Sequence, residues 1–365
     1  MKKILMVIDS LTGGGAEKVV ISLAEAMVEM GHMVTILSLS EHCDYLIPDR
    51  VSLHCLFEGK AAKVDRFWQL RRSINKLEQW FDGFQKSNGR FDLILSNLDK
   101  SNNLLAQSGL QDYKNLFFII HNSVEEELKR QKKMGPFAYG YLAKSKSNLE
   151  GKQLVTVSKG IENEIKSNDA ITPLSIQTIY NPFDFKNIKQ QSSIDNNDIP
   201  KSHYIIHVGR LARQKRHDIL FEAFKELDQK YQLVLLCNKP KKAKKLAKKY
   251  GIEDRVILPG FQSNPYNWIR HAEVLVLSSD YEGFGNVLVE ALSVGTKVVS
   301  TRCPHGPDEI LTGELSNFLV PRRDIKSLLA TLSMAVDAKV DVQSAKILQQ
   351  VSADKIAKQY LALCS

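Results

Sequence analysis

The sequence contains no apolar run close to the ~20 residues that a membrane-spanning helix needs. Residues 1–9 have an apolar core that is too short for a secretory signal peptide, and Asp9 interrupts it, so we interpret them as a first buried strand. The five cysteines form an odd, scattered set without a C-x-x-C pair. This pattern indicates a reducing compartment and argues against zinc, so we expect a cytoplasmic protein without a zinc site.

A dinucleotide fingerprint, an internal repeat and a nucleic-acid module are also lacking. The glycines at 13–15 follow the first strand in a Rossmann-like opening, but their spacing is not G-x-G-x-x-G. The strand predicted at 34–39 also ends without a ribose-binding acid. These absences weaken an assignment as a nicotinamide oxidoreductase. No solenoid period, base-stacking module or recognition helix occurs, which makes a nucleic-acid binder the least favoured class.

The formal net charge of +9 favours an anionic partner, a class that includes nucleic acid, acidic lipid headgroups and phosphorylated substrates. The densest basic run, residues 239–249, carries seven lysines. Four less polar residues follow a helical stripe through it: Ala243, Leu246, Ala247 and Tyr250. We therefore predict an amphipathic surface helix whose lysines face water, rather than a nucleic-acid patch.

A second basic stretch, residues 60–90, is also rich in aromatic side chains. Such mixtures lie on membrane surfaces in some proteins and pack against a core in others, and we favour packing with some surface contact. The basic balance is compatible with work at the anionic inner leaflet of the cytoplasmic membrane, so peripheral membrane contact stays an open expectation. The residues concerned are Lys63, Arg66, Phe67, Trp68, Arg71, Arg72, Lys76, Trp80 and Phe81.

Apolar strands alternate with amphipathic helices along the chain, which predicts an α/β fold. At 365 residues the chain is long for one core and suits two domains. Residues 185–202 are polar and without periodicity, so we interpret them as a linker between a first domain, residues 1–184, and a second, residues 203–353. Two β/α halves of similar size predict a crevice between them.

The stretch 278–290 carries the strongest functional signal. The apolar run at 274–277 predicts a buried strand, which breaks into a glycine-bearing turn and restarts with helical periodicity. The N-terminus of such a helix carries unsatisfied N–H groups and partial positive charge, which suit a phosphate. Glu282 and Glu290 bracket that N-terminus, and carboxylates accept hydrogen bonds from sugar hydroxyls. The pattern predicts a site for a sugar attached to a nucleotide diphosphate.

Two glutamates on a helix are more often a solvated face, so this prediction depends on its setting. Arg210 and Lys215 follow the strand predicted at 204–208, and a pair of such cations is less common than one. His121 follows a predicted strand at 116–120, where open α/β sheets place ligands, although a lone histidine is more often structural.

Taken together, these residues resemble glycosyltransferase family 4, and the resemblance spans nearly the whole chain. The glycine turn at 13–17 is the least specific part of it, and the E-x7-E block with the arginine–lysine pair is the most specific. The matching segments, in order, are Gly13-Gly14-Gly15-Ala16-Glu17, Gly209-Arg210 with Gln214-Lys215, Pro259-Gly260-Phe261, and Glu282-Gly283-Phe284-Gly285-Asn286 to Glu290.

The resemblance implies a GT-B fold, in which two Rossmann-like domains face a central crevice and the last helix, residues 354–365, packs back on the first domain. It implies a retaining transferase that uses no metal or other cofactor, with the nucleotide sugar as substrate. Arg210 and Lys215 would grip the donor diphosphate. Glu282 would hold the donor sugar, as an organiser rather than a nucleophile, and His121 would lie beside that sugar.

Further donor contacts follow from the same resemblance. Glu290 would bind the ribose hydroxyls and backbone near Phe261 would seat the base. Amides at Gly285, Asn286 and Val287 would meet phosphate and sugar, and Gly14 and Gly15 would face the diphosphate from the other domain. Cys237-Asn238-Lys239-Pro240 stands where many relatives carry a glycine-rich turn, which puts contacts from that loop in doubt.

The segment at 303–311 resembles bacterial members that transfer UDP-linked hexoses or N-acetylhexosamines to lipid-linked or lipopolysaccharide acceptors. We therefore expect a UDP-sugar donor and a role in surface polysaccharide assembly. Two alternatives on the same fold stay open, namely a non-catalytic sugar-nucleotide-binding protein and a nucleotide-sugar epimerase. Loss of Glu282, Arg210 or Lys215 would indicate the first alternative, and all three residues are present.

Overall fold

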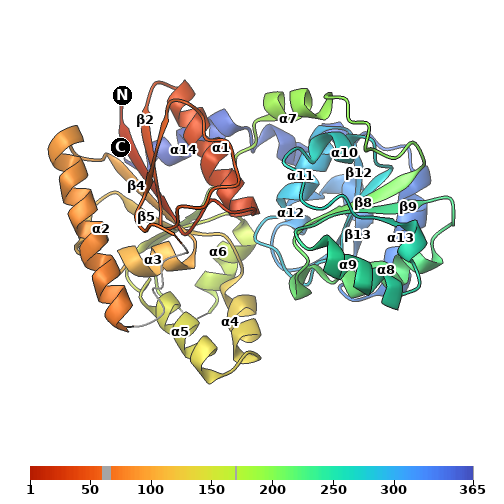
Figure 1. Cartoon of the computed structure of the whole chain (residues 1–365), viewed down its shortest axis with the longest axis horizontal. Coiled ribbons are helices and arrows are strands. Elements are labelled where there is room, and N and C mark those ends of the chain that lie inside the picture. The colour runs from red at the N-terminus through yellow and green to blue at the C-terminus, as the bar shows by residue number, and fades with distance from the viewer. Residues whose placement is uncertain (60–66, 169–170, 365) are drawn as a thin grey trace. The chain divides into compact units, whose positions relative to one another are not determined.

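The structure is a computed structural model that describes residues 1–59, 67–168 and 171–364. It divides into two compact units, each built on a parallel sheet (Figure 1). Unit 1 comprises Met1–Pro182 with Ala353–Ser365, and unit 2 comprises Phe183–Ser352. Within the described ranges, no helix is both long and apolar enough to cross a membrane.

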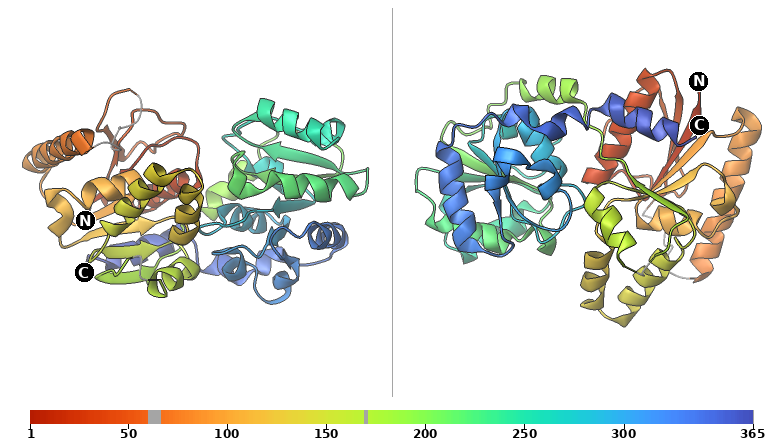
Figure 2. Two further views of the ribbon diagram at one scale, coloured as in Figure 1. Left: turned by 90° about the horizontal axis from the view of Figure 1, so that it is seen from below. Right: turned by 180° about the vertical axis from the view of Figure 1, so that it is seen from behind.

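The sheet of unit 1 has seven parallel strands in the order β3-β2-β1-β4-β5-β6-β7. The chain therefore moves outward in one direction from β1 and in the other from β4, as in Rossmann-like folds. Because parallel crossovers are right-handed, this reversal places helices on both faces of the sheet (Figure 2). The strands are β1 (Lys3–Ile8), β2 (Met33–Ser38), β3 (Val51–Cys55), β4 (Leu93–Asn97), β5 (Leu116–Ile120), β6 (Gln153–Thr156) and β7 (Ser175–Thr178).

The helices of unit 1 include the C-terminal one, which packs against the first. The Lys2 ammonium donates to the carbonyl of Leu361 at 3.0 Å, so both ends of the chain lie together (Figure 1). The helices are α1 (Gly15–Glu29), α2 (Phe67–Asn88), α3 (Asp99–Leu105), α4 (Val124–Lys132), α5 (Pro136–Ser147), α6 (Lys159–Lys166) and α14 (Ala353–Ala362).

The aromatic side chains that the structure describes on α2 pack within unit 1. Trp80 stacks on Phe84 with ring centroids 5.2 Å apart, and Phe84 stacks on Phe91 at 5.0 Å. Residues 60–66, which include Lys63 and Arg66, lie outside the described residues. The aromatic side chains described on α2 therefore pack within unit 1, as the packing alternative predicted.

The sheet of unit 2 has six parallel strands in the order β10-β9-β8-β11-β12-β13. Its strands are β8 (Tyr204–Val208), β9 (Gln232–Leu236), β10 (Val256–Ile257), β11 (Val274–Leu277), β12 (Lys297–Thr301) and β13 (Leu319–Val320). Its helices are α7 (Phe185–Ser192), α8 (His217–Glu226), α9 (Pro240–Lys249), α10 (Tyr266–Arg270), α11 (Asn286–Ser293), α12 (Pro307–Ile310) and α13 (Ile325–Asp337). The lysine-rich run is confirmed as a surface helix, because α9 buries Ala243 and Ala247 and exposes its lysines.

The predicted linker, residues 185–202, is not irregular throughout, because its first half forms α7. Asp184 caps this helix by accepting a hydrogen bond from the amide of Asn187 at 2.9 Å. Ile188 is buried, and α7 packs against α10 and α11 of unit 2. One buried isoleucine in a polar segment gave too weak a periodic signal to indicate a helix.

Candidate functional site

Two loops of unit 2 meet where the strand order of its sheet reverses. Strands β8 and β11 are neighbours, and the loops after them, residues 209–216 and 278–285, leave the same edge of the sheet. Open α/β sheets bind ligands at this kind of position. The structure thus brings the predicted arginine–lysine segment beside the predicted glutamate turn.

An ion pair between Lys215 and Glu282 joins the two loops. The Lys215 Nζ lies 2.7 Å from the Glu282 Oε1, and their side chains are only 16% and 10% exposed. Neutral hydrogen bonds hold the same loops together, because the Gln214 amide donates to the carbonyl of Tyr281 and the Ser278 hydroxyl to that of Lys215, both at 2.7 Å. These hydrogen bonds to backbone carbonyls therefore hold the loop of Lys215 against the loop of Glu282.

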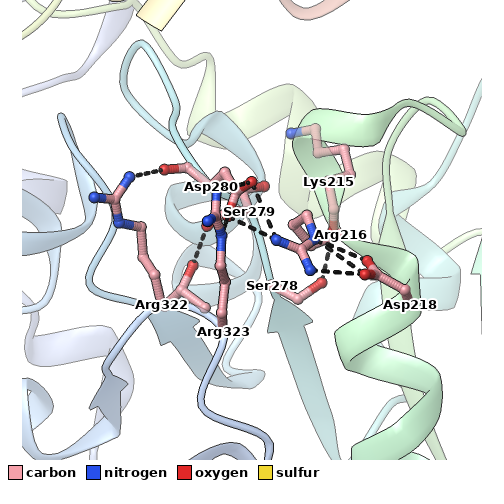
Figure 3. A network of polar contacts seen from close by, with 9 residues as sticks. Lys215, Arg216, Asp218, Ser278, Ser279, Asp280, Arg322 and Arg323 are labelled. Atoms are coloured by element: carbon pink, nitrogen blue, oxygen red, sulfur yellow. Dashed lines mark hydrogen bonds and ion pairs between the residues drawn. The ribbon is translucent and has the colours of Figure 1, made fainter.

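Asp280, in the same loop as Glu282, is the centre of a charged network (Figure 3). Its carboxylate accepts from Arg323 Nε at 2.8 Å and Nη2 at 2.9 Å, and from Arg216 Nη1 at 3.3 Å. Arg216 follows Lys215 directly, and Asp280 stands two residues before Glu282. Arg216 and Arg323 both have left-handed backbone, with φ of 47° and 63°, which costs about 1–2 kcal/mol per residue. The hydrogen bonds to Asp280 therefore hold Arg216 and Arg323 in these strained backbone conformations.

The turn after Glu282 is packed backbone against backbone. Gly285 has φ of 94° and is the N-cap of α11, whose first turn contains Asn286 and Val287. The Glu282 amide donates to the carbonyl of Pro304 at 3.1 Å. At Gly306, an added Cβ would lie 1.7 Å from the Phe284 carbonyl oxygen. This close approach fixes the position at which the helix N-terminus presents its amides.

The other predicted donor contacts of unit 2 lie around these loops. Glu290 is buried on α11, and the Tyr266 hydroxyl donates to its Oε1 at 3.5 Å. The Phe261 side chain is 49% exposed after β10. The Arg210 side chain is exposed and has no hydrogen-bond or ion-pair partner among the described residues. Asn238 lies in the loop that departs from the family pattern. Its side-chain oxygen accepts a hydrogen bond at 3.1 Å from the backbone amide of Leu211, the residue after Arg210.

In unit 1, the glycine turn opens α1. Gly14 is the N-cap of this 15-residue helix and Gly15 is its first residue, and the carboxylate of the buried Glu17 lies against Gly14, 2.2 Å from the place that a Cβ would take. Tyr45 holds the turn, since its hydroxyl accepts from the Gly14 amide at 3.0 Å and donates to the Gly14 carbonyl at 2.9 Å. The amide and the carbonyl of Gly14 are therefore both bonded to Tyr45, and glycine is needed at this position because a side chain would clash with Glu17.

His121 follows β5 and pairs with Asn97 at the end of β4. Its Nε2 lies 2.9 Å from the Asn97 Oδ1. Burial lowers the pKa of His121 to about 4, so the ring is neutral at neutral pH. Because an amide oxygen accepts, the Nε2 carries the proton, and the Nδ1 is an acceptor. A neutral acceptor at a strand's carboxyl end suits a hydroxyl group.

Two family models match consecutive parts of the chain. The model described as Glycosyltransferase Family 4 matches residues 13–187, and that described as Glycosyl transferases group 1 matches residues 188–346. The chain belongs to glycosyltransferase family 4. The matches extend across the described glycine turn, the Lys215–Glu282 pair and α11.

Curated relatives of this family 4 chain include transferases of surface glycans. The chain is 34% identical over 165 residues to N-acetylgalactosamine-N,N'-diacetylbacillosaminyl-diphospho-undecaprenol 4-alpha-N-acetylgalactosaminyltransferase of Campylobacter jejuni, or 45% of each chain. It is 28% identical over 197 residues to lipopolysaccharide 1,6-galactosyltransferase of Salmonella typhimurium, or 52% of this chain and 54% of that one. It thus spans about half the length of these two relatives. The amylovoran biosynthesis glycosyltransferase AmsD of Erwinia amylovora is 25% identical to this chain, and the match covers 85% of this chain and 84% of AmsD.

Solved structures with the same fold cover the whole family 4 chain. Anabaena HepE in complex with UDP-glucose superposes with a TM-score of 0.77 at 18% identity, covering 99% of both chains. WaaG, a glycosyltransferase involved in lipopolysaccharide biosynthesis, superposes with a TM-score of 0.69 at 15% identity, covering 99% of this chain and 95% of WaaG. These likenesses show the fold, which is the GT-B fold with two parallel-sheet α/β domains.

Several site residues of this family 4 chain escaped the sequence reasoning. Nothing in the sequence linked Asp280 to Arg323, which stands 43 positions later. Asp9 was treated only as a break in an apolar run, yet it accepts from the Ser101 amide at 2.7 Å beside the end of β4. Burial raises the pKa of Asp9 to about 6. A polar residue directly after a predicted strand was the available signal for Asp9.

Two buried histidines beneath Lys215 were also missed. The rings of His207 and His217 lie 4.8 Å apart, edge to face. Burial, followed by the nearby Lys215 charge, lowers the pKa of His217 to about 4, and burial together with His217 and Lys215 lowers that of His207 well below its usual value. Both rings are neutral at neutral pH, so the positive charge of this loop comes from its lysine and arginines.

Proposed function

We propose that the protein is a retaining glycosyltransferase that moves a hexose or N-acetylhexosamine from a UDP-linked sugar to a glycan acceptor. The single observation that carries this proposal is the fixed Lys215–Glu282 pair beside the N-terminus of α11, at the switch point of unit 2. It supplies a cation for a diphosphate and a carboxylate for sugar hydroxyls within one polar cluster. The complex of HepE with UDP-glucose supports the same donor class for this chain.

In the proposed mechanism, Arg210 and Lys215 neutralise the charge that develops on the departing diphosphate. Fixed cations do this without reorganising at the moment of reaction, which is a large term in many enzymes. Amides of Gly285, Asn286 and Val287 add hydrogen bonds to phosphate and sugar. From unit 1, the amides after Gly14 and Gly15 contact the diphosphate, and the acceptor Nδ1 of His121 binds a sugar hydroxyl.

Glu282 and Glu290 bind hydroxyl groups in this proposal. Glu282 organises the donor sugar while Lys215 holds its carboxylate, and Glu290 binds the ribose with the base seated near Phe261. The acceptor attacks from the face that the diphosphate leaves, and a donor phosphate oxygen takes its proton. The anomeric configuration is therefore retained without a second catalytic carboxylate.

For the acceptor, we propose a lipid-linked or lipopolysaccharide intermediate. One relative carries the name of a diphospho-undecaprenol transferase and another that of a lipopolysaccharide galactosyltransferase, which supports this class. Such acceptors lie in a membrane, so we also propose a cytoplasmic protein that contacts the anionic inner leaflet peripherally.

The proposal is tested by measuring UDP release from a panel of UDP-sugars, with and without a bacterial lipid extract as acceptor. We expect UDP release from one sugar class, dependent on the extract, and a product whose anomeric configuration NMR shows to be that of the donor. UDP binding without any transfer would favour a non-catalytic binding protein. Release of UDP, or conversion of the sugar, without an acceptor would favour epimerase-type chemistry.

A further inference from the structure

We propose that the tip of the α4–α5 hairpin inserts into an anionic lipid bilayer and docks the protein there. We define the tip as residues 130–139, which join the end of α4 to the first turn of α5. The inference rests on the proposed function for its purpose, because a membrane-bound acceptor gives the docking a use. Its evidence comes from the hairpin alone.

The tip exposes large apolar side chains close together. Phe137 is 94% exposed and Met134 is 69% exposed, and the ring of Tyr139 is exposed as well. Gly135 and Pro136 stand between Met134 and Phe137, and the proline starts α5. Burying a phenylalanine and a methionine side chain in an apolar medium is favourable, because it removes their apolar surface from water. In water these side chains have no such gain, so their position indicates an apolar partner.

Positive charge lies on the α4 side of the apolar tip. Between residues 128 and 140 the sequence has four lysines and arginines and no aspartate or glutamate. Lys129 is paired with Glu125 at 2.5 Å, whereas the exposed Lys132 and Lys133 pair with none of the residues that the structure describes. Exposed apolar side chains with cations beside them match an interface between anionic headgroups and acyl chains.

The base of the hairpin is held rigidly in unit 1. The Lys146 ammonium on α5 is buried and lies 2.6 Å from Asp99 and 3.1 Å from Glu127, which joins α5 to α3 and α4. Burial alone would lower the pKa of Lys146, but Asp99 and Glu127 raise it above its usual value, so the ammonium stays charged. Helix α4 starts three residues after His121. Docking at the tip therefore brings the sheet edge that carries His121 toward a membrane-bound acceptor.

The lysine helix α9 shows why charge alone does not make such a site. It has more exposed lysines than the tip, but the large apolar residues within it are not exposed. A surface that attracts anions without apolar insertion gives weak, salt-sensitive binding. The two surfaces therefore offer a matched comparison within one chain.

The test is co-sedimentation of the full chain with vesicles of phosphatidylglycerol and phosphatidylcholine in equal parts, and with pure phosphatidylcholine. We expect binding to the anionic vesicles only. The double variant Met134→Ser, Phe137→Ser should lower the partition coefficient at least ~10-fold, from the lost apolar burial. The double reversal Lys132→Glu, Lys133→Glu should lower it at least ~25-fold, since each of the two cations near such a surface contributes about fivefold.

Matched controls come from other exposed positions. Leu174→Ser removes an exposed leucine of unit 1 outside the tip, and Lys241→Glu with Lys242→Glu reverses two lysines of α9. We expect each control to bind vesicles within about twofold of the wild type, since neither lies on the proposed surface. Absence of vesicle binding by the wild type, or tip variants that bind as it does, would overturn the proposal. So would an equal loss in the α9 reversal, because general electrostatics would then explain the binding.

The outcome is separable from the fate of the proposed function. Thermal shifts with UDP are recorded for each variant, and we expect the tip variants to respond to UDP as the wild type does. Vesicle binding that fails while the UDP response persists removes the docking site and leaves the donor site standing. Vesicle binding that persists without any UDP response supports the docking site and removes the donor site.

Discussion

Replacing Lys215 by methionine is expected to lower kcat/KM by ~10²–10³-fold in the UDP-release assay. The lysine is held 2.7 Å from Glu282 by a partly buried ion pair, so its charge is fixed where the proposed diphosphate departs. Methionine keeps most of the side-chain volume and removes only the cation. The control is Arg213→Met, an exposed cation two residues away on the same loop, which should leave kcat/KM within about twofold.

A double-mutant cycle separates catalysis from structure at this pair. Lys215→Met alone also leaves the charge of Glu282 without its partner, which is destabilising in a buried site. In the Glu282→Gln background that charge is gone, so a structural role for Lys215 would leave nothing more to lose. We expect Lys215→Met to cost a further ~10²-fold there. A cost near zero in this background would contradict a direct action of Lys215 on the diphosphate.

Gly306→Ala should strongly destabilise unit 2, although it adds only one methyl group. The added Cβ would lie 1.7 Å from the Phe284 carbonyl oxygen, and both are backbone positions that cannot rotate away. The residue also has φ of 94°, a conformation that alanine avoids. We expect a loss of about 2–5 kcal/mol in unfolding free energy, measured by chemical denaturation, and weaker UDP binding because the turn after Glu282 must shift.

Gly313→Ala is the matched control for this clash. Gly313 also has a positive φ, 61°, but an added Cβ would meet nothing within 4 Å. Its substitution by alanine should therefore lower the free energy of unfolding only by the strain of the positive φ, about 1–2 kcal/mol, and leave UDP binding unchanged. Equal losses in the two variants would mean that the contact with Phe284 does not constrain the donor turn.

The sequence predicted the sheets well where strands are buried on both faces. Strands β8 and β11 occur over the predicted residues, because an unbroken apolar run in an α/β chain is typical of a buried parallel strand. Strand β3 was missed, since of its five residues only Val51 is fully buried at the sheet edge. Helix α7 was missed for a similar reason, a polar composition with one strong buried contact at Ile188.

The candidate site was predictable where chemistry follows a strand directly in the chain. Lys215 and Glu282 each come shortly after an apolar strand, so the topology brings them to one edge of the sheet. The charged network around Asp280 was not predictable in this way. It depends on Arg323, which comes after β13 and reaches Asp280 only through the packing of three loops. Pairing at such separations is set by tertiary structure, which local patterns do not record.

The most direct test of the central claim is calorimetric titration of UDP into the full chain. Three proteins are compared: the wild type, Glu290→Gln, and Glu314→Gln as an exposed glutamate control on the same unit. We predict that the wild type and Glu314→Gln bind UDP alike, and that Glu290→Gln binds at least ~10-fold more weakly, the loss expected for a hydrogen bond to a charged group. No binding by the wild type, or equal binding by all three, would contradict a donor site built on α11.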